Sequence, residues 1–223
     1  MRISDLRDVP ANAEYYSDLK VLIEQYGIIG NDLIVAREDT IAISTEPIGS
    51  LFYPKTKLTN RQFAFLFDAS LGYLKDTIGG YKLPDSLDAV EKYALMQELR
   101  NSINRKPLNK INLTTSKEVT GLQMKFEESF AVASLVDRHR LGADLLNSNG
   151  EYARMRLYSE KEISDILANA LQLKPICVKG KCNIGNLTLN YKNRTVERGR
   201  FVRLLNQYLE AYIAKLNSVI NRK

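Results

Sequence analysis

Apolar side chains recur every three or four residues in four segments of the chain, a spacing that places them on one face of an α-helix. We therefore expect helices at residues 11–26, 63–78, 87–103 and 160–171. The last of these has the clearest start, because Ser159 and Glu162 have the spacing of a capping box. A fifth helix is expected after Thr195, which we predict to be its N-terminal cap, and continues towards the C-terminus.

A second capping-box pattern, Thr115 with Glu118, predicts a long helix. It would extend from Lys117 to about Leu146. Gly121 or Gly142 would be the place for a break, since a glycine inside a helix costs about 1 kcal/mol relative to alanine.

Strands are predicted where β-branched and alternating residues flank turn residues. The sequence DLIVAREDTIAIS at residues 32–44 suits a hairpin, and PICVKGKCNIGNLTLNY at 175–191 suits two antiparallel strands. The sequence YARMRLY at 152–158 alternates strictly, so we expect a strand that buries Ala153, Met155 and Leu157.

The turn sequence NSNG at residues 147–150 is the expected boundary between two parts. Residues 1–150 would form a mainly helical part with a small β-hairpin. Residues 151–223 would form a β-α-β-β-α unit, in which one small sheet has both helices on one face. The fold class is therefore predicted as predominantly helical α+β, and the two parts either stay separate or pack as one domain.

Charge is distributed unevenly along the chain, whose net charge is +6. Residues 1–50 carry four basic and nine acidic side chains, whereas residues 174–223 carry eleven basic and two acidic ones. Such asymmetry is typical of contact with a polyanion, and it equally suits head-to-tail packing of like subunits.

The predicted strand at 152–158 would carry its polar residues on the solvent face of the sheet. Cationic groups bind phosphates, and aromatic rings stack on the bases of single strands. This candidate nucleic-acid-binding surface consists of Tyr152, Arg154, Arg156 and Tyr158, extended by Lys179 and Lys181 of the predicted hairpin. The alternative is an ordinary exposed strand whose tyrosines and arginines pair across the sheet.

Four arginines crowd the start of the last helix, where the helix dipole disfavours cations. They are Arg194, Arg198, Arg200 and Arg203. A bound phosphate would explain them, because helix N-termini attract anions. Carboxylates of the acidic N-terminal part, such as Asp5, Asp8, Glu38 or Asp39, would explain them equally well.

The last helix also has an apolar stripe made of Val202, Leu205, Leu209, Tyr212, Leu216 and Val219. Stripes of this kind usually pack in the chain's own core. The same stripe would suit a homo-oligomer in which two copies of this helix pair.

Cys177 and Cys182 could be bridged across a tight hairpin, but two cysteines are too few for a disulfide framework, so we expect them to be reduced thiols. The N-terminus has no apolar run of the length that a signal peptide needs, and no later run is long enough to span a membrane. We therefore expect no membrane contact and a cytoplasmic location.

Catalytic signatures are missing from the sequence. His139 is the single histidine, which excludes sites built on two histidines, and a zinc site would have at most three ligands. The carboxylates Glu160, Glu162 and Asp165 lie at the start of a helix, where solvated acids are common. We predict no cofactor and no metal, while a metal-dependent nuclease assembled from distant carboxylates stays open.

Two functions remain for the protein. The first is a non-enzymatic nucleic-acid-binding accessory protein that uses the basic C-terminal surface on DNA or RNA. The second is a structural or assembly protein of a virion or another large complex, which self-associates through acidic N-terminal and basic C-terminal surfaces. We favour the first slightly.

Overall fold

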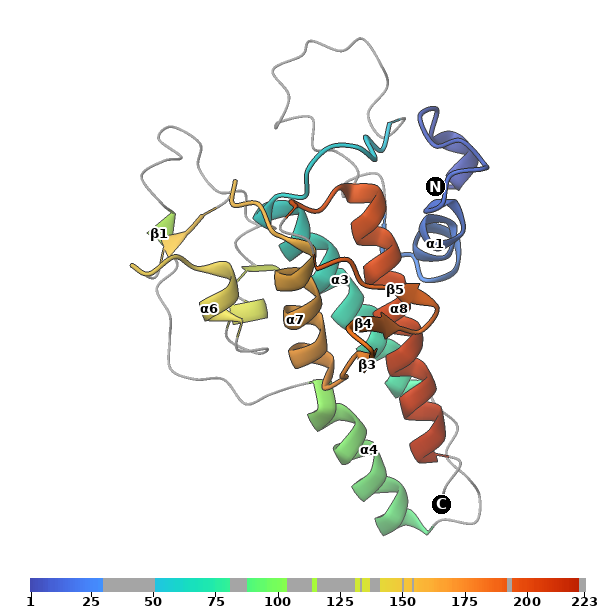
Figure 1. The fold of residues 1–223 in the computed structure, drawn as a ribbon. Helices are drawn as coiled ribbons and strands as arrows, with labels where there is room; N and C mark the ends of the chain where they lie inside the picture. The colour runs from blue at the N-terminus through green and yellow to red at the C-terminus, as the bar shows by residue number, and fades with distance from the viewer. Residues whose placement is uncertain are drawn as a thin grey trace.

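The computed structural model describes residues 1–29, 51–80, 88–103, 114–115, 131–132, 134–136, 141–149, 151–153, 155–191 and 194–220. Helices dominate these residues, and short strands connect two of them (Figure 1). The helical elements are η1 (Ile3–Asp5), α1 (Tyr16–Lys20), the π-helical turn η2 (Val21–Gln25), α3 (Asn60–Gly79), α4 (Ala89–Ile103), α6 (Gly142–Leu145), α7 (Glu160–Leu171) and α8 (Arg198–Ile220). The strands are β1 (Thr114–Thr115), β2 (Glu151–Tyr152), β3 (Ile176–Val178), β4 (Lys181–Ile184) and β5 (Leu187–Thr188).

Three of the helices predicted from periodicity are confirmed, namely α3, α4 and α7. Helix α7 begins at the predicted capping box, in which the Ser159 N–H donates to Glu162 Oε2 at 2.7 Å and the Glu162 N–H donates to Ser159 Oγ at 3.3 Å. A similar box formed by Thr59 and Gln62 starts α3. Both helices therefore begin where side chains satisfy main-chain donors that have no partner within the helix.

The chain segments that precede α3, α7 and α8 meet and hydrogen-bond to one another. The Leu58 N–H donates to the Val196 C=O at 2.8 Å, and the Val196 N–H donates to the Tyr158 C=O at 2.8 Å. The Asn60 N–H donates to the Arg156 C=O, also at 2.8 Å. We call these three segments, residues 57–60, 156–159 and 195–197, the helix-start junction. All three helices begin at this end of the molecule, and α8 packs against both α3 and α7 (Figure 1).

Aromatic side chains form the core below the helix-start junction. The ring centroid of Phe63 lies 5.4 Å from those of Phe67 and Tyr158 and 5.8 Å from that of Phe201. All four side chains are fully buried. The Tyr158 hydroxyl donates to Asn60 Oδ1 at 2.7 Å, so its polar atom is satisfied inside the core.

The segment 152–158 differs from the predicted strand. Only Glu151 and Tyr152 are in strand β2, which pairs in parallel with β1 and not with the hairpin. The chain turns after Tyr152, where the Arg156 N–H donates to the Ala153 C=O at 3.1 Å. The prediction of one sheet that contains residues 152–158 and the hairpin is therefore wrong.

The hairpin region contains three antiparallel strands in the order β3-β4-β5, one more than predicted. Lys179 and Gly180 connect β3 to β4 with φ angles of 48° and 78°, as in a type I′ turn. Gly185 connects β4 to β5, and a Cβ atom there would lie 2.5 Å from the amide oxygen of Gln207 on α8. The second turn favours glycine because its φ of 53° lies in the left-handed region, whereas the flexible end of the Gln207 side chain could move aside.

Several other predictions change in detail. Residues 16–25 form α1 and η2 instead of one helix over 11–26, and Thr195 lies before α8 in a bridge to Ser159 instead of capping it. The Thr115 of the second capping-box pattern is in strand β1. The predicted hairpin at 32–44 and most of the predicted helix at 117–146 lie outside the described residues.

Helix α8 packs against α1 and α3 of the N-terminal part as well as against α7. The boundary near residue 150 stays a prediction. Among the described helices, none has the length and apolar character required to cross a bilayer.

Replacing Tyr158 by Phe should destabilise the fold by about 1 to 3 kcal/mol, because Asn60 Oδ1 would lose its buried donor. Urea unfolding followed by circular dichroism would measure this loss as a lower midpoint. Tyr191→Phe is the matched control, since that ring is 39% exposed, and its midpoint should not change. Equal midpoints for the two variants would contradict the role given to Tyr158.

Candidate functional site

The two tyrosines of the predicted binding strand are inside the protein. Tyr152 and Tyr158 are fully buried, whereas Met155 and Leu157 are 52% and 44% exposed. The expected faces are therefore reversed. Burial raises the pKa of the Tyr158 phenol far above its ordinary value, so this residue stays a neutral hydrogen-bond donor. Neither ring is accessible for stacking on a base, and Arg154 lies outside the described residues.

Arg156 connects three parts of the chain. Its guanidinium donates to the Asp144 C=O at 2.9 Å and to Glu162 Oε1 at 3.2 Å, and its Cζ atom lies 4.9 Å from the ring centroid of Tyr158. Partial burial raises the pKa of the Glu162 carboxyl, but hydrogen bonds from Ser159 and Arg156 outweigh this and hold the pKa below its usual value. Arg156 thus contributes to the start of α7.

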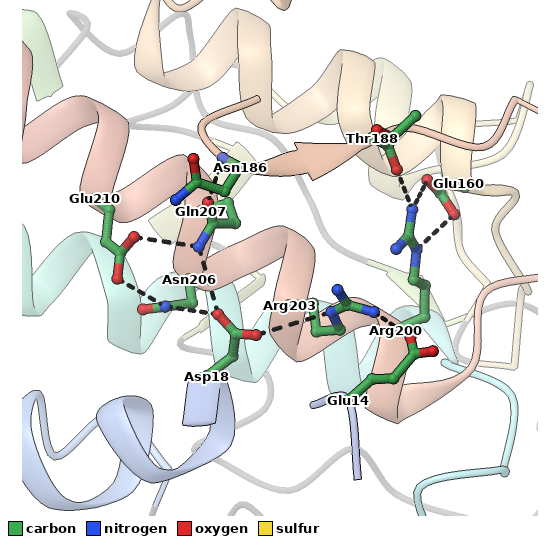
Figure 2. A network of polar contacts seen from close by, with 10 residues as sticks. All are labelled: Glu14, Asp18, Glu160, Asn186, Thr188, Arg200, Arg203, Asn206, Gln207 and Glu210. Atoms are coloured by element: carbon green, nitrogen blue, oxygen red, sulfur yellow. Dashed lines mark hydrogen bonds and ion pairs between the residues drawn. The ribbon is translucent and has the colours of Figure 1, made fainter. Parts of the chain in front are cut away.

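Arg200 forms a two-pronged ion pair with Glu160 (Figure 2). The distances are 2.9 Å from Arg200 Nε to Glu160 Oε2 and 2.7 Å from Nη2 to Oε1. Glu160 also accepts the Asn190 N–H, and Arg200 donates to the Thr188 C=O. Only 8% of the Glu160 side chain is exposed, so the predicted solvated position of this carboxylate is wrong. The ion pair thus connects the end of strand β5 to α7 and α8.

Arg203 lies between two carboxylates of the N-terminal part, Glu14 and Asp18 (Figure 2). Asp18 also accepts a hydrogen bond from Asn206 Nδ2 at 2.8 Å, which extends the contact along α8. Arg198 is buried and donates to Gln62 Oε1 and to the Phe52 C=O, both at 3.2 Å. Arg203 therefore fits the second explanation of the arginine cluster, whereas Arg200 pairs with a carboxylate of α7 and Arg198 with neutral groups.

The acids that pair with the cluster are not those named from the sequence. Glu14, Asp18 and Glu160 do so, whereas Asp5 accepts the Arg2 N–H and Asp8 accepts the Phe52 and Tyr53 N–H groups. Glu38 and Asp39 lie outside the described residues. Asp18 and Glu160 lie in the first turns of α1 and α7, but the sequence does not show which arginine each one meets, because the partners are far away along the chain.

The β3–β4 hairpin presents a different kind of surface. The hairpin and the residues next to it carry exposed aliphatic and cationic side chains, which we call the hairpin surface: Lys174, Ile176, Val178, Lys179 and Lys181. Val178 and Lys181 are register partners and so lie on the same face. On the other face Ile184 and Leu187 are buried, and β4 and β5 contact α8.

The lysines of the hairpin surface, together with Arg194, make no ion pair with any residue that the structure describes. Ile176 and Val178 are 72% and 61% exposed, which is high for aliphatic residues. The binding surface predicted from the sequence contained Lys179 and Lys181 but not the two aliphatic residues. Their alternation with Cys177 was the signal available.

The described ranges contain no group of three or more His, Cys, Asp or Glu side chains that could hold a metal ion. His139 lies outside them. Comparisons with protein-family models, with curated proteins and with solved structures found no match to this chain.

Replacing Glu160 by Gln should lower the free energy of unfolding by about 3 kcal/mol, since one partner of a largely buried ion pair loses its charge. This is the lower end of the usual range because Arg200 is one-quarter exposed. Chemical unfolding would measure the loss. Asp165→Asn is the control, because its pair with Lys161 is exposed on both sides and should contribute little. A Glu160→Gln variant as stable as the control would show that the pair contributes nothing.

Proposed function

We propose that this protein is a non-enzymatic nucleic-acid-binding accessory protein that contacts phosphates through the hairpin surface. The observation that supports the proposal is which basic side chains are paired within the chain and which are not. Arg156, Arg198, Arg200 and Arg203 are engaged within the chain. Lys174, Lys179, Lys181 and Arg194 are exposed and lack an ion-pair partner among the described residues, so they remain available to an outside polyanion.

The composition of this surface indicates what kind of contact it would make. Lysine ammonium groups bind phosphates as point charges and release counterions, which gives affinity without reading sequence. The buried rings of Tyr152 and Tyr158 take no part in stacking. We therefore propose binding that depends on the backbone of DNA or RNA and has little sequence preference.

The alternative is a structural or assembly protein that self-associates. The apolar stripe of α8 does not supply its interface, because Val202, Leu205, Leu209, Tyr212 and Leu216 are buried in the chain's own core. Self-association through acidic N-terminal and basic C-terminal surfaces is also less favoured, since Glu14 and Asp18 already contact Arg203 within the chain. What favours the alternative is a pair of exposed residues one turn apart on α4, Val90 and Tyr93, at 76% and 68% exposure.

The cytoplasmic location and the lack of catalytic activity remain predictions from the sequence. The structure contains a disulfide between Cys177 and Cys182, and disulfides are more typical of oxidising compartments. Cell fractionation of the full chain would decide the location independently of the binding function.

Replacing both Lys179 and Lys181 by Gln should weaken binding to oligonucleotides. Removing two phosphate contacts should reduce the slope of log K against log salt by about 1.8 on double-stranded DNA. The measurement is fluorescence anisotropy with labelled single- and double-stranded oligonucleotides between 50 and 200 mM salt.

The matched control is Lys55→Gln with Lys75→Gln, which removes the same charge from exposed positions outside the hairpin. It should retain most of the salt slope. Equal losses in both double variants would mean that net charge, and not the hairpin surface, determines binding. A chain that binds neither oligonucleotide at 50 mM salt and forms oligomers would support the assembly alternative instead.

A further inference from the structure

Strand β3 has few contacts that hold it to the rest of the protein. All three of its residues are exposed, and within the described ranges its only strand partner is β4. Strands β4 and β5 are different, because Ile184 and Leu187 are buried and both strands contact α8. A short hairpin pairing without a buried face is marginally stable in water. Something other than apolar packing must keep β3 in place.

A cross-strand disulfide supplies that attachment. Cys177 of β3 and Cys182 of β4 are bonded, which corrects the prediction of reduced thiols. They are the middle pair of the three register pairs that join the two strands. Cys177 is exposed and Cys182 is partly buried, so solvent reaches the disulfide from the side of β3. Exposed disulfides are the ones most accessible to thiol exchange.

We propose that the Cys177–Cys182 disulfide is a redox-controlled latch on the hairpin surface. In the oxidised state it holds β3 against β4, so that Lys174, Lys179 and Lys181 stay in one arrangement. In the reduced state β3 separates from β4, while β4 and β5 stay on α8. The consequence for nucleic-acid binding rests on the proposed function, whereas the release of β3 does not.

The reaction is an ordinary thiol–disulfide exchange with a dithiol reductant. One thiolate of the reductant attacks Sγ of Cys177, forms a mixed disulfide and displaces Cys182 as a thiolate, which takes up a proton. The second thiolate of the reductant then displaces Cys177, which is protonated in turn. The products are two cysteine thiols and the oxidised, cyclic reductant, so two electrons pass from the dithiol to the protein.

Amide hydrogen exchange tests the release of β3 without any ligand. Oxidised protein is compared with protein reduced by dithiothreitol, and exchange is followed in residues 176–182 and in α7 and α8. We expect exchange in the hairpin to become faster by about tenfold or more on reduction, because opening is local, while α7 and α8 keep their protection. Unchanged exchange in the hairpin would overturn the proposal.

Oligonucleotide affinity of the same two samples at 50 mM salt tests the consequence. We expect reduction to weaken binding by about threefold or more, since the binding arrangement is then only partly populated. The control is Cys177→Ser with Cys182→Ser, which should bind like the reduced protein and not respond to dithiothreitol.

The outcomes separate the two proposals. If the oxidised protein binds and reduction releases β3 without changing affinity, the regulatory role is refuted although the proposed function stands. If the oxidised protein does not bind at all, the proposed function fails, and hydrogen exchange alone decides whether the disulfide holds β3.

Discussion

The meeting of three helix starts is the constraint on which the rest of the structure depends. The segments before α3, α7 and α8 satisfy one another's main-chain groups, as in the Leu58–Val196 and Val196–Tyr158 hydrogen bonds. A helix start normally leaves its first N–H groups without partners, and burying such groups is costly. Side-chain caps satisfy part of that need in α3 and α7, and the junction fixes where each helix enters the core. Asn60 reinforces it by donating to the C=O groups of Leu145 and Ala153.

The same junction explains the basic cluster that the sequence made conspicuous. Because α8 begins there, its first turns lie between α7 on one side and α1 on the other. Arg200 meets Glu160 and Arg203 meets Glu14 and Asp18 as a result of that placement (Figure 2). Glu14 and Arg203 are 189 residues apart in sequence. A charge asymmetry between the two ends of a chain is therefore as compatible with internal pairing as with an outside polyanion.

Local sequence predicted what local interactions determine. The box of Ser159 and Glu162 involves four consecutive residues, and it starts α7 as predicted. The segment 152–158 could not be predicted in this way, because its alternation allows either face to be buried. The surroundings that bury Tyr158 come from distant parts of the chain: Phe63 packs against its ring, and Asn60, 98 residues away, accepts a hydrogen bond from its hydroxyl. The predicted hairpin likewise brought the two cysteines near each other, but only the register of β3 and β4 places them directly opposite.

These contacts divide the described structure into two parts. The body, made of α1, α3, α7 and α8, is held by many internal contacts, whereas the β3–β4 hairpin is held by few. In the body, Tyr158 and the arginines at the start of α8 are engaged with other parts of the chain, so an outside ligand would have to break existing interactions to use them. At the hairpin, by contrast, a ligand that binds the lysines and the two exposed aliphatic residues would displace only water. A binding surface is therefore less costly to form on the hairpin than on α8, even though α8 has more arginines. Cations that are already paired within the chain say little about an outside ligand. The exposed cations of the hairpin surface, which have no ion-pair partner among the described residues, are the better indication of where such a ligand would bind.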